Sequence, residues 1–374
     1  MKIIFTGGGT GGHIFPIIAI VREMRKKRPD FKFYYIGPKN KSTVFLLSQE
    51  GITVKTILSG KIRRYWKGKA ILENLLDIFI KIPIGLLQSS FYIFFLFPDL
   101  VFSKGGYGAF PISLTGWIYI TPVMLHESDA TPGLANRIMS KLALEIFSSF
   151  PVKKAGVFPS GKIICVGNPL RQEILKGEEK EAKDIFKLDD EKPVILILGG
   201  SQGSQRINEV ILNILPRLLE NFQIIHQTGS ENFNQVERGA EIMIQGPNKK
   251  NYYPISFLEE NRIKHAYKAA GLIITRAGAG SIFEIAACEK PSILIPLPES
   301  AQDHQVKNAY AYQKTGACIV IEEKNLAGHF LLERLKYLFS DPNELKNMSA
   351  ATKLFSRPRA AEIIAQYILE YLIY

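Results

Sequence analysis

A histidine directly follows a glycine-rich segment near the beginning of the chain. The segment reads GGGTGG at residues 7–12, and the histidine is His13. Between a strand and a helix, such a turn lets backbone N–H groups approach phosphate oxygens, and an imidazole beside it can accept a proton near neutral pH. The same residues also fit a tight turn that needs glycine backbone angles, with a structural histidine at the start of a helix. Both interpretations predict a strand before the glycines and a helix after them.

A second glycine-rich segment, GGSQGS at residues 199–204, opens the other half of the chain. The hydroxyls of Ser201 and Ser204 are suited to donating hydrogen bonds to a diphosphate, and a serine here can equally cap the next helix. The segment lacks the Lys-Ser or Lys-Thr ending of a nucleotide triphosphatase loop. It therefore predicts binding of a phosphorylated ligand rather than phosphate hydrolysis.

The first glycine turn fits the GxGxxG pattern of dinucleotide-binding domains, but the carboxylate that belongs to this pattern is missing. In that fingerprint an acidic residue near the end of the second strand holds a ribose. Here the strand expected at 31–36 is followed by Gly37, Pro38 and Lys39, and Asp30 lies at its opposite end. A NAD-dependent oxidoreductase is therefore disfavoured.

Composition and charge limit the class of ligand. The 374 residues carry a formal net charge of +12, which suits nucleic acid, acidic lipid or phosphorylated substrates. The sequence contains no zinc-ligand spacing, no familiar nucleic-acid motif and no DxD triplet that could hold a metal between phosphates. We therefore expect no nucleic-acid partner, no cofactor and no metal ion.

The cysteines and the N-terminus indicate a reducing compartment. Cys165, Cys288 and Cys318 lie in or beside apolar stretches, as expected of buried thiols rather than of a disulfide framework. The first residues lack the long apolar segment and cleavage site of a signal peptide. We therefore expect the protein to stay in the cytoplasm.

Short apolar runs alternate with helical patterns throughout the chain. In the first helical pattern, Ile14, Ile17, Ile18, Val21 and Met24 share one face. The expected strands are 2–6, 31–36, 52–57, 99–103, 122–126 and 162–166 in the first half, and 193–198, 222–226, 272–275, 292–296 and 317–321 in the second. Such alternation predicts parallel strands joined by crossover helices.

Both halves begin with a strand, a glycine-rich turn and a helix. This repetition predicts an α/β fold of two Rossmann-like domains whose parallel sheets face one another across a cleft. We place the first domain at residues 1–166 and the second at 167–358, with a hinge near Gly167–Arg171. The last helix, 359–374, can pack on either domain and is a candidate to complete the first.

A basic segment adjoins an apolar one in the first half. The basic residues, which surround Tyr65 and Trp66, are Lys61, Arg63, Arg64, Lys67 and Lys69. Residues 71–102 follow and are strongly apolar, although Pro83 and the polar residues 88–90 interrupt them. We interpret 71–102 as a buried or membrane-surface segment rather than a span, and the basic segment as a contact for an anionic bilayer or as a solvated loop.

Six motifs carry a resemblance that is specific because they occur together and in order. They are GGGTGGHIFPIIAI at 7–20, HESDATPGLANR at 126–137, GNPLR at 167–171, GGSQGS at 199–204, TRAGAGSIFEIAA at 275–287 and DHQVKNA at 303–309. Over nearly the whole chain the set resembles glycosyltransferase family 28, and in particular its GT-B enzymes that act on the lipid-linked precursor of the bacterial cell wall.

The resemblance implies a reaction and its partners. N-acetylglucosamine would pass from UDP-N-acetylglucosamine, with inversion to a β linkage, to the C4 hydroxyl of the muramyl sugar on a polyprenyl-diphosphate-linked pentapeptide. The C-terminal domain would bind the donor and the N-terminal domain the lipid acceptor. The enzyme would work peripherally, on the cytoplasmic face of the inner (plasma) membrane and against its anionic surface.

The resemblance also implies the site residues. His13 would be the base, although an orienting role stays open. The donor-binding residues would be Thr10, Gly11, Gly12, Arg171, Ser201, Leu258 near the uracil, Glu284 on the ribose hydroxyls, and Gln305 on the donor sugar. The acceptor-binding residues would be Gly9, Gly106 and Asn136.

Several of these residues have a structural alternative. Ser281 and Glu284 read as a capping box, which would make the glutamate part of a helix start. Arg171 can fork onto phosphate oxygens or form an interdomain salt bridge, and Asn136 also fits an exposed helix surface. Where the family often has Glu-Gln-Asn, this chain has Glu127-Ser128-Asp129, so the roles of these two carboxylates stay open.

Two other functions fit the same features. Another GT-B lipid glycosyltransferase, such as one that acts on diacylglycerol, would share the fold and the donor site. A non-catalytic nucleotide-sugar-binding subunit would share the glycine-rich turns but would not need His13.

Overall fold

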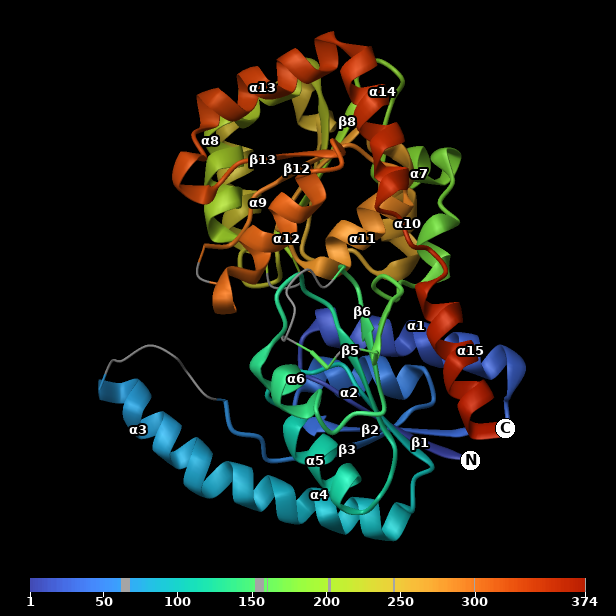
Figure 1. Ribbon diagram of the computed structural model, residues 1–374. Coiled ribbons are helices and arrows are strands. Elements are labelled where there is room, and N and C mark those ends of the chain that lie inside the picture. Colours follow the sequence, from blue (N-terminus) through green and yellow to red (C-terminus); the bar gives the residue numbers. More distant parts are fainter. Residues whose placement is uncertain are drawn as a thin grey trace. The chain divides into compact units, whose positions relative to one another are not determined.

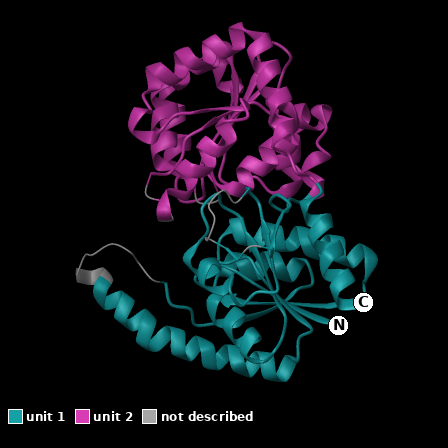
Figure 2. Cartoon of the chain, in the orientation of Figure 1, with its two compact units in different colours: residues 1–171, 359–374 teal, residues 172–358 magenta. Residues whose placement is uncertain are grey.

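A computed structural model describes residues 1–61, 68–151, 158–159, 161–200, 203–244, 246–298 and 300–373. The chain forms two compact units, one of residues 1–171 with 359–374 and one of residues 172–358 (Figure 2). Within the described residues, the first unit holds a seven-stranded sheet and the second a six-stranded sheet. The division falls after Arg171, so the GNPLR segment belongs to the first unit instead of opening the second, and the last helix returns to the first unit.

The first unit is a parallel sheet with the strand order β3-β2-β1-β4-β5-β6-β7 (Figure 1). Its strands are β1 (Lys2–Thr6), β2 (Lys32–Pro38), β3 (Thr53–Ile57), β4 (Leu100–Ser103), β5 (Val123–Glu127), β6 (Glu145–Ser148) and β7 (Ile163–Cys165). Its helices are α1 (Gly11–Lys27), α2 (Lys41–Gln49), α3 (Gly68–Leu76), η1 (Asp77–Lys81), α4 (Ile82–Leu96), α5 (Phe110–Ile118), α6 (Leu134–Met139) and α15 (Ala360–Ile373).

Alternating side chains of the central strands build two cores on opposite faces of this sheet. Ile3 and Phe5 of β1 pack with residues of α1 and α15. Ile4, between them, packs on the other face with residues of α4 and α5. A parallel sheet covered on both faces needs such continuously apolar strands, and KIIFT supplies one.

The C-terminal helix α15 lies alongside α1 and closes the first core (Figure 1). Ile364 and Ile368 have no exposed surface and belong to the cluster that contains Ile17 and Val21. Burying such side chains stabilises the unit by about 1.5–3 kcal/mol each. The first unit is therefore complete only when the chain returns to it from the second.

The second unit is also a parallel sheet, with the strand order β10-β9-β8-β11-β12-β13. Its strands are β8 (Val194–Leu198), β9 (Gln223–Gln227), β10 (Tyr252–Ile255), β11 (Leu272–Thr275), β12 (Ser292–Leu294) and β13 (Cys318–Val320). Its helices are η2 (Gln172–Leu175), α7 (Glu179–Phe186), α8 (Gln205–Asn221), α9 (Phe233–Met243), η3 (Gly246–Asn251), α10 (Glu260–Ala269), α11 (Ala279–Ala287), η4 (Ala301–Asp303), α12 (His304–Gln313), η5 (Glu323–Asn325), α13 (Gly328–Ser340), α14 (Pro342–Ala351) and η6 (Thr352–Leu354).

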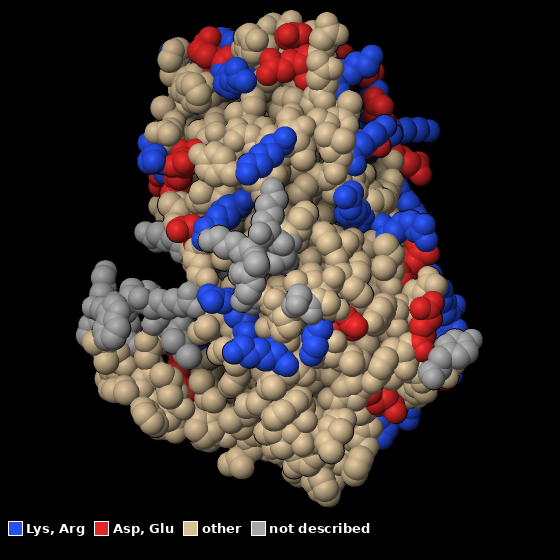
Figure 3. All heavy atoms as spheres, in the orientation of Figure 1, with Lys and Arg blue, Asp and Glu red and all other residues tan. Residues whose placement is uncertain are grey.

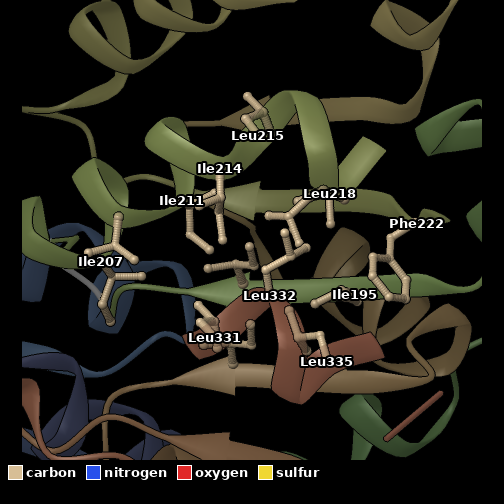
Figure 4. Packing of buried hydrophobic residues seen from close by; sticks show 14 of the residues in the cluster. Ile195, Ile207, Ile211, Ile214, Leu215, Leu218, Phe222, Leu331, Leu332 and Leu335 are labelled. Carbon is tan, nitrogen blue, oxygen red and sulfur yellow. The ribbon is translucent and has the colours of Figure 1, made fainter. Parts of the chain in front are cut away.

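The main core of the second unit lies between β8, α8 and α13. Ile211 and Leu218 of α8 point towards Ile195 of β8, and Leu331 and Leu335 of α13 fill the space beside them (Figure 4). Apolar residues three to four positions apart form this face of α8, which is the amphipathic pattern of a helix on a sheet. This packing of α8 on the sheet fixes the position of its first residues, which directly follow the second glycine turn.

The expected strands correspond to strands of the structure, with boundary shifts of one or two residues at most ends. Two strands were not expected, β6 with the sequence EIFS and β10 with YYPI. Each has four residues and carries a charged residue or a proline, so its apolar run is too short to be recognised from periodicity. Their neighbours in the sheets, not their composition, place them.

The apolar segment after residue 70 forms a long helical stretch whose surface is mostly exposed. Residues Ile71–Leu96 span 26 residues, and only 17% of their most apolar window is buried. By length and composition this helix could cross a membrane, a test that core helices of soluble proteins also pass. Since so little of it is buried, the expectation of a buried segment is wrong for Ile71–Leu96, and the membrane-surface interpretation stays a prediction.

One cysteine also departs from expectation. Cys318 is buried and Cys288 is half-buried, but Cys165 is exposed. Cys165 ends β7, which is the edge strand of its sheet, so no further strand covers it. The interpretation of all three as buried thiols is therefore wrong for Cys165.

The return of α15 generates a stability prediction. Ile368→Ala should lower the free energy of unfolding of the first unit by about 2–5 kcal/mol, because it leaves a cavity in the α1–α15 core. Denaturant titration monitored by circular dichroism measures the change. Ile363→Ala is the matched control, because Ile363 lies on the same helix and is 42% exposed. Equal losses in the two variants would contradict the packing described here.

Candidate functional site

The first glycine turn leads from the carboxyl end of β1 into α1 and places His13 over it. Thr10 is the N-terminal cap residue of α1, and its carbonyl accepts a hydrogen bond from the backbone N–H of His13. The Thr10 hydroxyl lies 3.0 Å from Nδ1 of His13. Neighbouring elements hold the turn, since Tyr35 donates to the Gly7 carbonyl at 3.1 Å and Asn40 to the Gly9 carbonyl at 3.1 Å. The imidazole is therefore oriented by a cap residue on a fixed turn.

A second turn, after β4, supports the same histidine. Gly105 and Gly106 have φ angles of +77° and +80°, which side chains rarely adopt. A Cβ atom on Gly106 would lie 3.2 Å from Nε2 of His13, and one on Gly105 would lie 2.6 Å from the amide of Asn136. The two glycines therefore allow the close approach of His13 and Asn136 to this turn.

Glu127 ends β5 as a buried carboxyl group with both oxygens hydrogen-bonded. One oxygen accepts the Asp129 backbone N–H at 3.0 Å, and the other accepts the Gly133 N–H at 3.0 Å and the Asn136 amide at 2.9 Å. Burial, and then the charge of Asp129, raise the pKa of Glu127 to about 7. A carboxyl group with such a pKa can exchange a proton near neutral pH.

Asn136 is part of this arrangement rather than of an exposed helix surface. It lies on α6, is 3% exposed, and donates to the His126 carbonyl at 3.2 Å as well as to Glu127. The surface-helix alternative for Asn136 is therefore wrong. Its amide shapes the loop between β5 and α6, which holds the Glu127 carboxylate.

Sequence reasoning missed Lys104, which is 2% exposed directly after β4. Its Nζ lies 2.6 Å from Nδ1 of His126 and donates to the Ser128 hydroxyl at 2.8 Å and to the Asn168 side-chain oxygen at 3.3 Å. The other nitrogen of His126 faces the Gly167 carbonyl at 3.1 Å, so His126 donates there and accepts from Lys104. The only available signal was a lysine between a buried strand and two glycines.

Arg171 is buried in the first unit with its guanidinium carbon 3.9 Å from the ring centroid of Phe15. Phe15 follows His13 on α1 by two residues, so this stacking places a cation beside the start of that helix. The side chain is only 6% exposed. The guanidinium is thus oriented from within its own unit.

In the second unit, the glycine turn after β8 leads into α8, and Ser204 caps that helix as predicted. The Ser204 hydroxyl accepts the Ile207 N–H at 3.4 Å and a bond from Arg276 at 2.6 Å. Arg276, directly after β11, also donates to the Ile295 carbonyl at 3.2 Å and pairs with Glu323 at 2.5 Å. Sequence reasoning missed Arg276, which ties the start of α8 to β11 and β12. Ser201 lies outside the described residues.

Glu284 lies in the middle of α11 and is not part of a capping box. The cap residue of α11 is Gly278, and Ser281 is already inside the helix. The Tyr267 hydroxyl donates to a carboxylate oxygen of Glu284 at 3.0 Å. The capping-box alternative for Glu284 is therefore wrong, and its half-buried carboxylate is oriented by a tyrosine.

Gln305 lies beside a loop of the second unit, whereas Leu258 lies in its core. The side-chain oxygen of Gln305 accepts the Leu297 N–H at 3.0 Å, which holds the loop after β12. Gln302 and Asp303 just before α12 both have positive φ, an uncommon backbone for such residues. Leu258 is 2% exposed and packs in the core, and its backbone N–H donates to the Gln227 side-chain oxygen at 2.9 Å.

The predicted residues gather at the carboxyl ends of the strands in each unit, where ligands of open α/β sheets bind. In the first unit these residues are Gly9, Thr10, Gly11, Gly12, His13, Gly106, Asn136 and Arg171. In the second unit they are Glu284 and Gln305, with Leu258 in the core. Within the described part of the chain, no group of three or more His, Cys, Asp or Glu side chains could hold a metal ion.

The whole length of the chain matches known proteins. Residues 3–148 match the glycosyltransferase family 28 N-terminal domain, and residues 194–364 match the family 28 C-terminal domain. The chain belongs to glycosyltransferase family 28. A family 28 relative from Clostridium tetani, named UDP-N-acetylglucosamine--N-acetylmuramyl-(pentapeptide) pyrophosphoryl-undecaprenol N-acetylglucosamine transferase, is 35% identical over 98% of both chains.

Solved structures agree with the two-sheet fold. The Acinetobacter baumannii MurG structure has a TM-score of 0.71 at 23% identity and covers 99% of both chains. A UDP-GlcNAc 2-epimerase from Neisseria meningitidis, bound to UDP-GlcNAc, has a TM-score of 0.70 at 17% identity over 99% of this chain and 100% of its own. At these identities the likeness establishes the fold, whereas the family follows from the sequence.

The turn under His13 generates a prediction about this family 28 site. Gly106→Ala should reduce transfer at least about tenfold, because the added Cβ displaces the imidazole as well as straining a positive φ. Gly161→Ala is the control, because Gly161 has a φ of +89° but open space around its Cβ position. The melting temperature, measured by calorimetry, should fall by a similar amount in both variants. Equal activity losses would show that backbone strain, not the position of His13, was the cause.

Proposed function

We propose that this chain transfers N-acetylglucosamine from UDP-N-acetylglucosamine to the lipid-linked muramyl pentapeptide precursor of peptidoglycan. The new β linkage forms at the C4 hydroxyl of the muramyl sugar, with inversion at the donor carbon. The observation that carries the proposal is the full-length similarity to relatives named for this reaction, together with an oriented histidine at the first glycine turn.

Two groups of the first unit are suited to removing the proton from the acceptor hydroxyl. His13 is held by Thr10 at the helix start, and Glu127 is a buried carboxyl group with a pKa raised to about 7. His13 is the proposed base, because Glu127 already uses both oxygens in hydrogen bonds to its own loop. Glu127 and Asn136 then shape the acceptor side of the site.

The leaving diphosphate needs stabilisation of its negative charge, which the second unit supplies without a metal in this proposal. The backbone N–H groups at the start of α8 form an anion site, and Arg276 adds a cation next to the capping Ser204. Arg171, predicted from the sequence to bind the donor, is held beside α1 in the first unit. Glu284 on α11 accepts the ribose hydroxyls, since a carboxylate is an acceptor only.

An assay of transfer to different acceptors distinguishes the alternative functions. The fold is shared with UDP-GlcNAc 2-epimerases, but their low identity carries no assignment of reaction. A diacylglycerol glycosyltransferase or a non-catalytic subunit would fail to elongate a muramyl pentapeptide acceptor. Screening radiolabelled nucleotide sugars against a short-chain polyprenyl acceptor tests the proposal, and transfer to diacylglycerol alone would overturn it.

Glu284→Ala should weaken binding of UDP at least about tenfold, because a hydrogen bond to a charged group contributes about 1.5–3 kcal/mol. The melting temperature should fall modestly, because the buried Tyr267 hydroxyl loses an acceptor. Isothermal titration calorimetry with UDP measures the affinity. Glu333→Ala on α13 is the control, since Glu333 makes a surface pair with Lys336. Unchanged affinity with lowered stability would remove Glu284 from the nucleotide site.

The exposed apolar side of the helical stretch 71–96 is the proposed membrane contact, and we call it the apolar face. Its residues are Ile71, Leu72, Leu75, Leu76, Ile78, Phe79, Ile80, Ile84, Leu87, Phe91, Phe94 and Phe95. Figure 3 shows few charged side chains over this part of the first unit. An exposed patch of this extent is typical of a surface that meets a membrane or a partner.

The helix is attached to its unit along the opposite side, which favours lying on a bilayer over spanning it. Gly85, Ser89 and Ile93 follow one another at helical spacing and are buried. A Cβ on Gly85 would lie 2.1 Å from the Leu58 carbonyl, so α4 touches the backbone there. A helix held in this way presents its outer side to the membrane surface. Arg63, Arg64 and Lys67, proposed to add electrostatic attraction, lie outside the described residues.

Replacing both Phe79 and Phe95 with aspartate should strongly reduce sedimentation with anionic vesicles, because these side chains are 71% and 63% exposed on the apolar face. UDP affinity should stay unchanged. Phe330→Asp on α13 of the second unit, where the side chain is 53% exposed, is the control. Vesicle binding that survives the double change, or falls equally in the control, would place the membrane contact elsewhere.

A further inference from the structure

Lys104 is a buried lysine at the junction of three loops of the first unit. Its own turn follows β4, His126 and Ser128 come from the end of β5 and the loop after it, and Asn168 comes from the GNPLR segment. Each of the three N–H groups of an ammonium ion can thus find an acceptor. A buried charge needs this complete hydrogen bonding to be tolerated.

The neighbouring acidic groups supply opposite charge. Glu127 is 5% exposed, and Asp129 follows it by two residues, with its N–H bonded to the Glu127 carboxylate. The charge of Asp129 disfavours the ionised form of Glu127 and so raises the pKa of Glu127. Burial lowers the pKa of Lys104 to about 7, and the charges of Glu127 and Asp129 raise it against that effect. The lysine and the two acids therefore form one electrostatic unit.

The same lysine also fixes the backbone beneath the site. Gly105 and Gly106 follow it directly and lie against Asn136 and His13. Anchoring the Lys104 side chain in three loops holds this turn, with its two positive φ angles, in place. A displacement of Lys104 would therefore move the turn and disturb both His13, the proposed base, and Asn136, whose amide binds Glu127.

We propose that Lys104 is a positioning residue for the acceptor side of the reaction, and that its ammonium group is the counter-charge that allows Asp129 to stand beside Glu127. The proposal rests on the assignment of the acceptor site to the first unit. It goes further in linking a buried lysine beneath the site to the loops that would meet the acceptor.

A double-mutant cycle separates this role from simple packing. Lys104→Met keeps the length of the side chain and removes its charge, and Asp129→Asn removes the opposing charge without changing shape. Each single change should lower kcat/KM for the acceptor, the lysine change by about tenfold or more, with the KM for UDP-N-acetylglucosamine within about twofold of the parent. The double variant should lose less than the product of the two single losses, because the two charges leave together while the hydrogen bonds of Lys104 to three loops stay lost.

The pH profile is the readout that a purely structural role would not move. The titratable groups around the cluster are Lys104, His126, Glu127, Asp129 and, over Gly106, His13. Without the Lys104 charge the Glu127 carboxylate is less favoured, so the pH limb of Glu127 ionisation, followed by 13C NMR of its carboxyl carbon, should move to higher pH. Without the Asp129 charge it should move to lower pH, and the double variant should lie between the two.

Controls keep the result interpretable. Lys162→Met removes a lysine near the opposite ends of the same strands, where Nζ binds the Ala143 carbonyl at 2.7 Å, and should leave rate and pH profile unchanged. If the Lys104→Met variant does not fold, Lys104→Gln replaces it, because glutamine keeps hydrogen-bonding groups without the charge. The melting temperatures of the single and double variants measure the coupling in stability between positions 104 and 129, independently of activity.

The outcomes are distinct. Additive losses in the double variant, in both melting temperature and kcat/KM, would overturn the proposal, as would an unmoved pH limb. A donor KM that rises as much as the acceptor KM would do the same. If Glu127→Gln leaves kcat/KM for the acceptor unchanged, the acceptor-site assignment has failed, while a coupling of melting temperatures between positions 104 and 129 would still support the charge pairing.

Discussion

Both sheets of this protein are parallel and covered on both faces, and this constraint determines where polar chemistry can occur. Central strands such as β1 and β8 are buried and almost wholly apolar, so they leave no room for functional side chains along their length. Charged and hydroxyl groups are instead displaced to the loops at the carboxyl ends. His13, Lys104, Glu127 and Arg276 all lie at such ends.

The loops at these ends must hold charges that the sheet interior would exclude. In the first unit a carboxyl group and an ammonium group are both almost fully buried, and each has hydrogen-bond partners from several loops. Their pKa values converge on about 7 from opposite sides, because burial disfavours the charged form of each. In the second unit, Arg276 fulfils a comparable task with a paired glutamate and two carbonyl groups beside the glycine turn. Buried charge that is fully hydrogen-bonded gives a rigid site that needs little rearrangement when substrate arrives.

The two units share their architecture and differ in their surfaces. The first carries the apolar face on α3, η1 and α4, and its core is completed by α15 after the chain has traversed the second unit. The second keeps its helices α8 and α13 packed on its own sheet, with apolar side chains turned inwards. This asymmetry fits the proposal that the first unit meets a lipid-linked acceptor and the second a water-soluble donor.

The sequence alone determined the repeated strand, glycine turn and helix, because these features depend on local periodicity and on glycine backbone angles. It also determined the family, since the six motifs keep their order over nearly the whole chain. Only the tertiary structure decided the short strands β6 and β10, whose neighbours rather than composition hold them, and the return of α15 to the first unit. It also decided that Glu284 faces Tyr267 instead of capping a helix, and that Lys104 meets His126 and Asn168 from loops far apart in the chain. Burial and hydrogen bonding between distant segments are properties of packing, and no local pattern of residues encodes them.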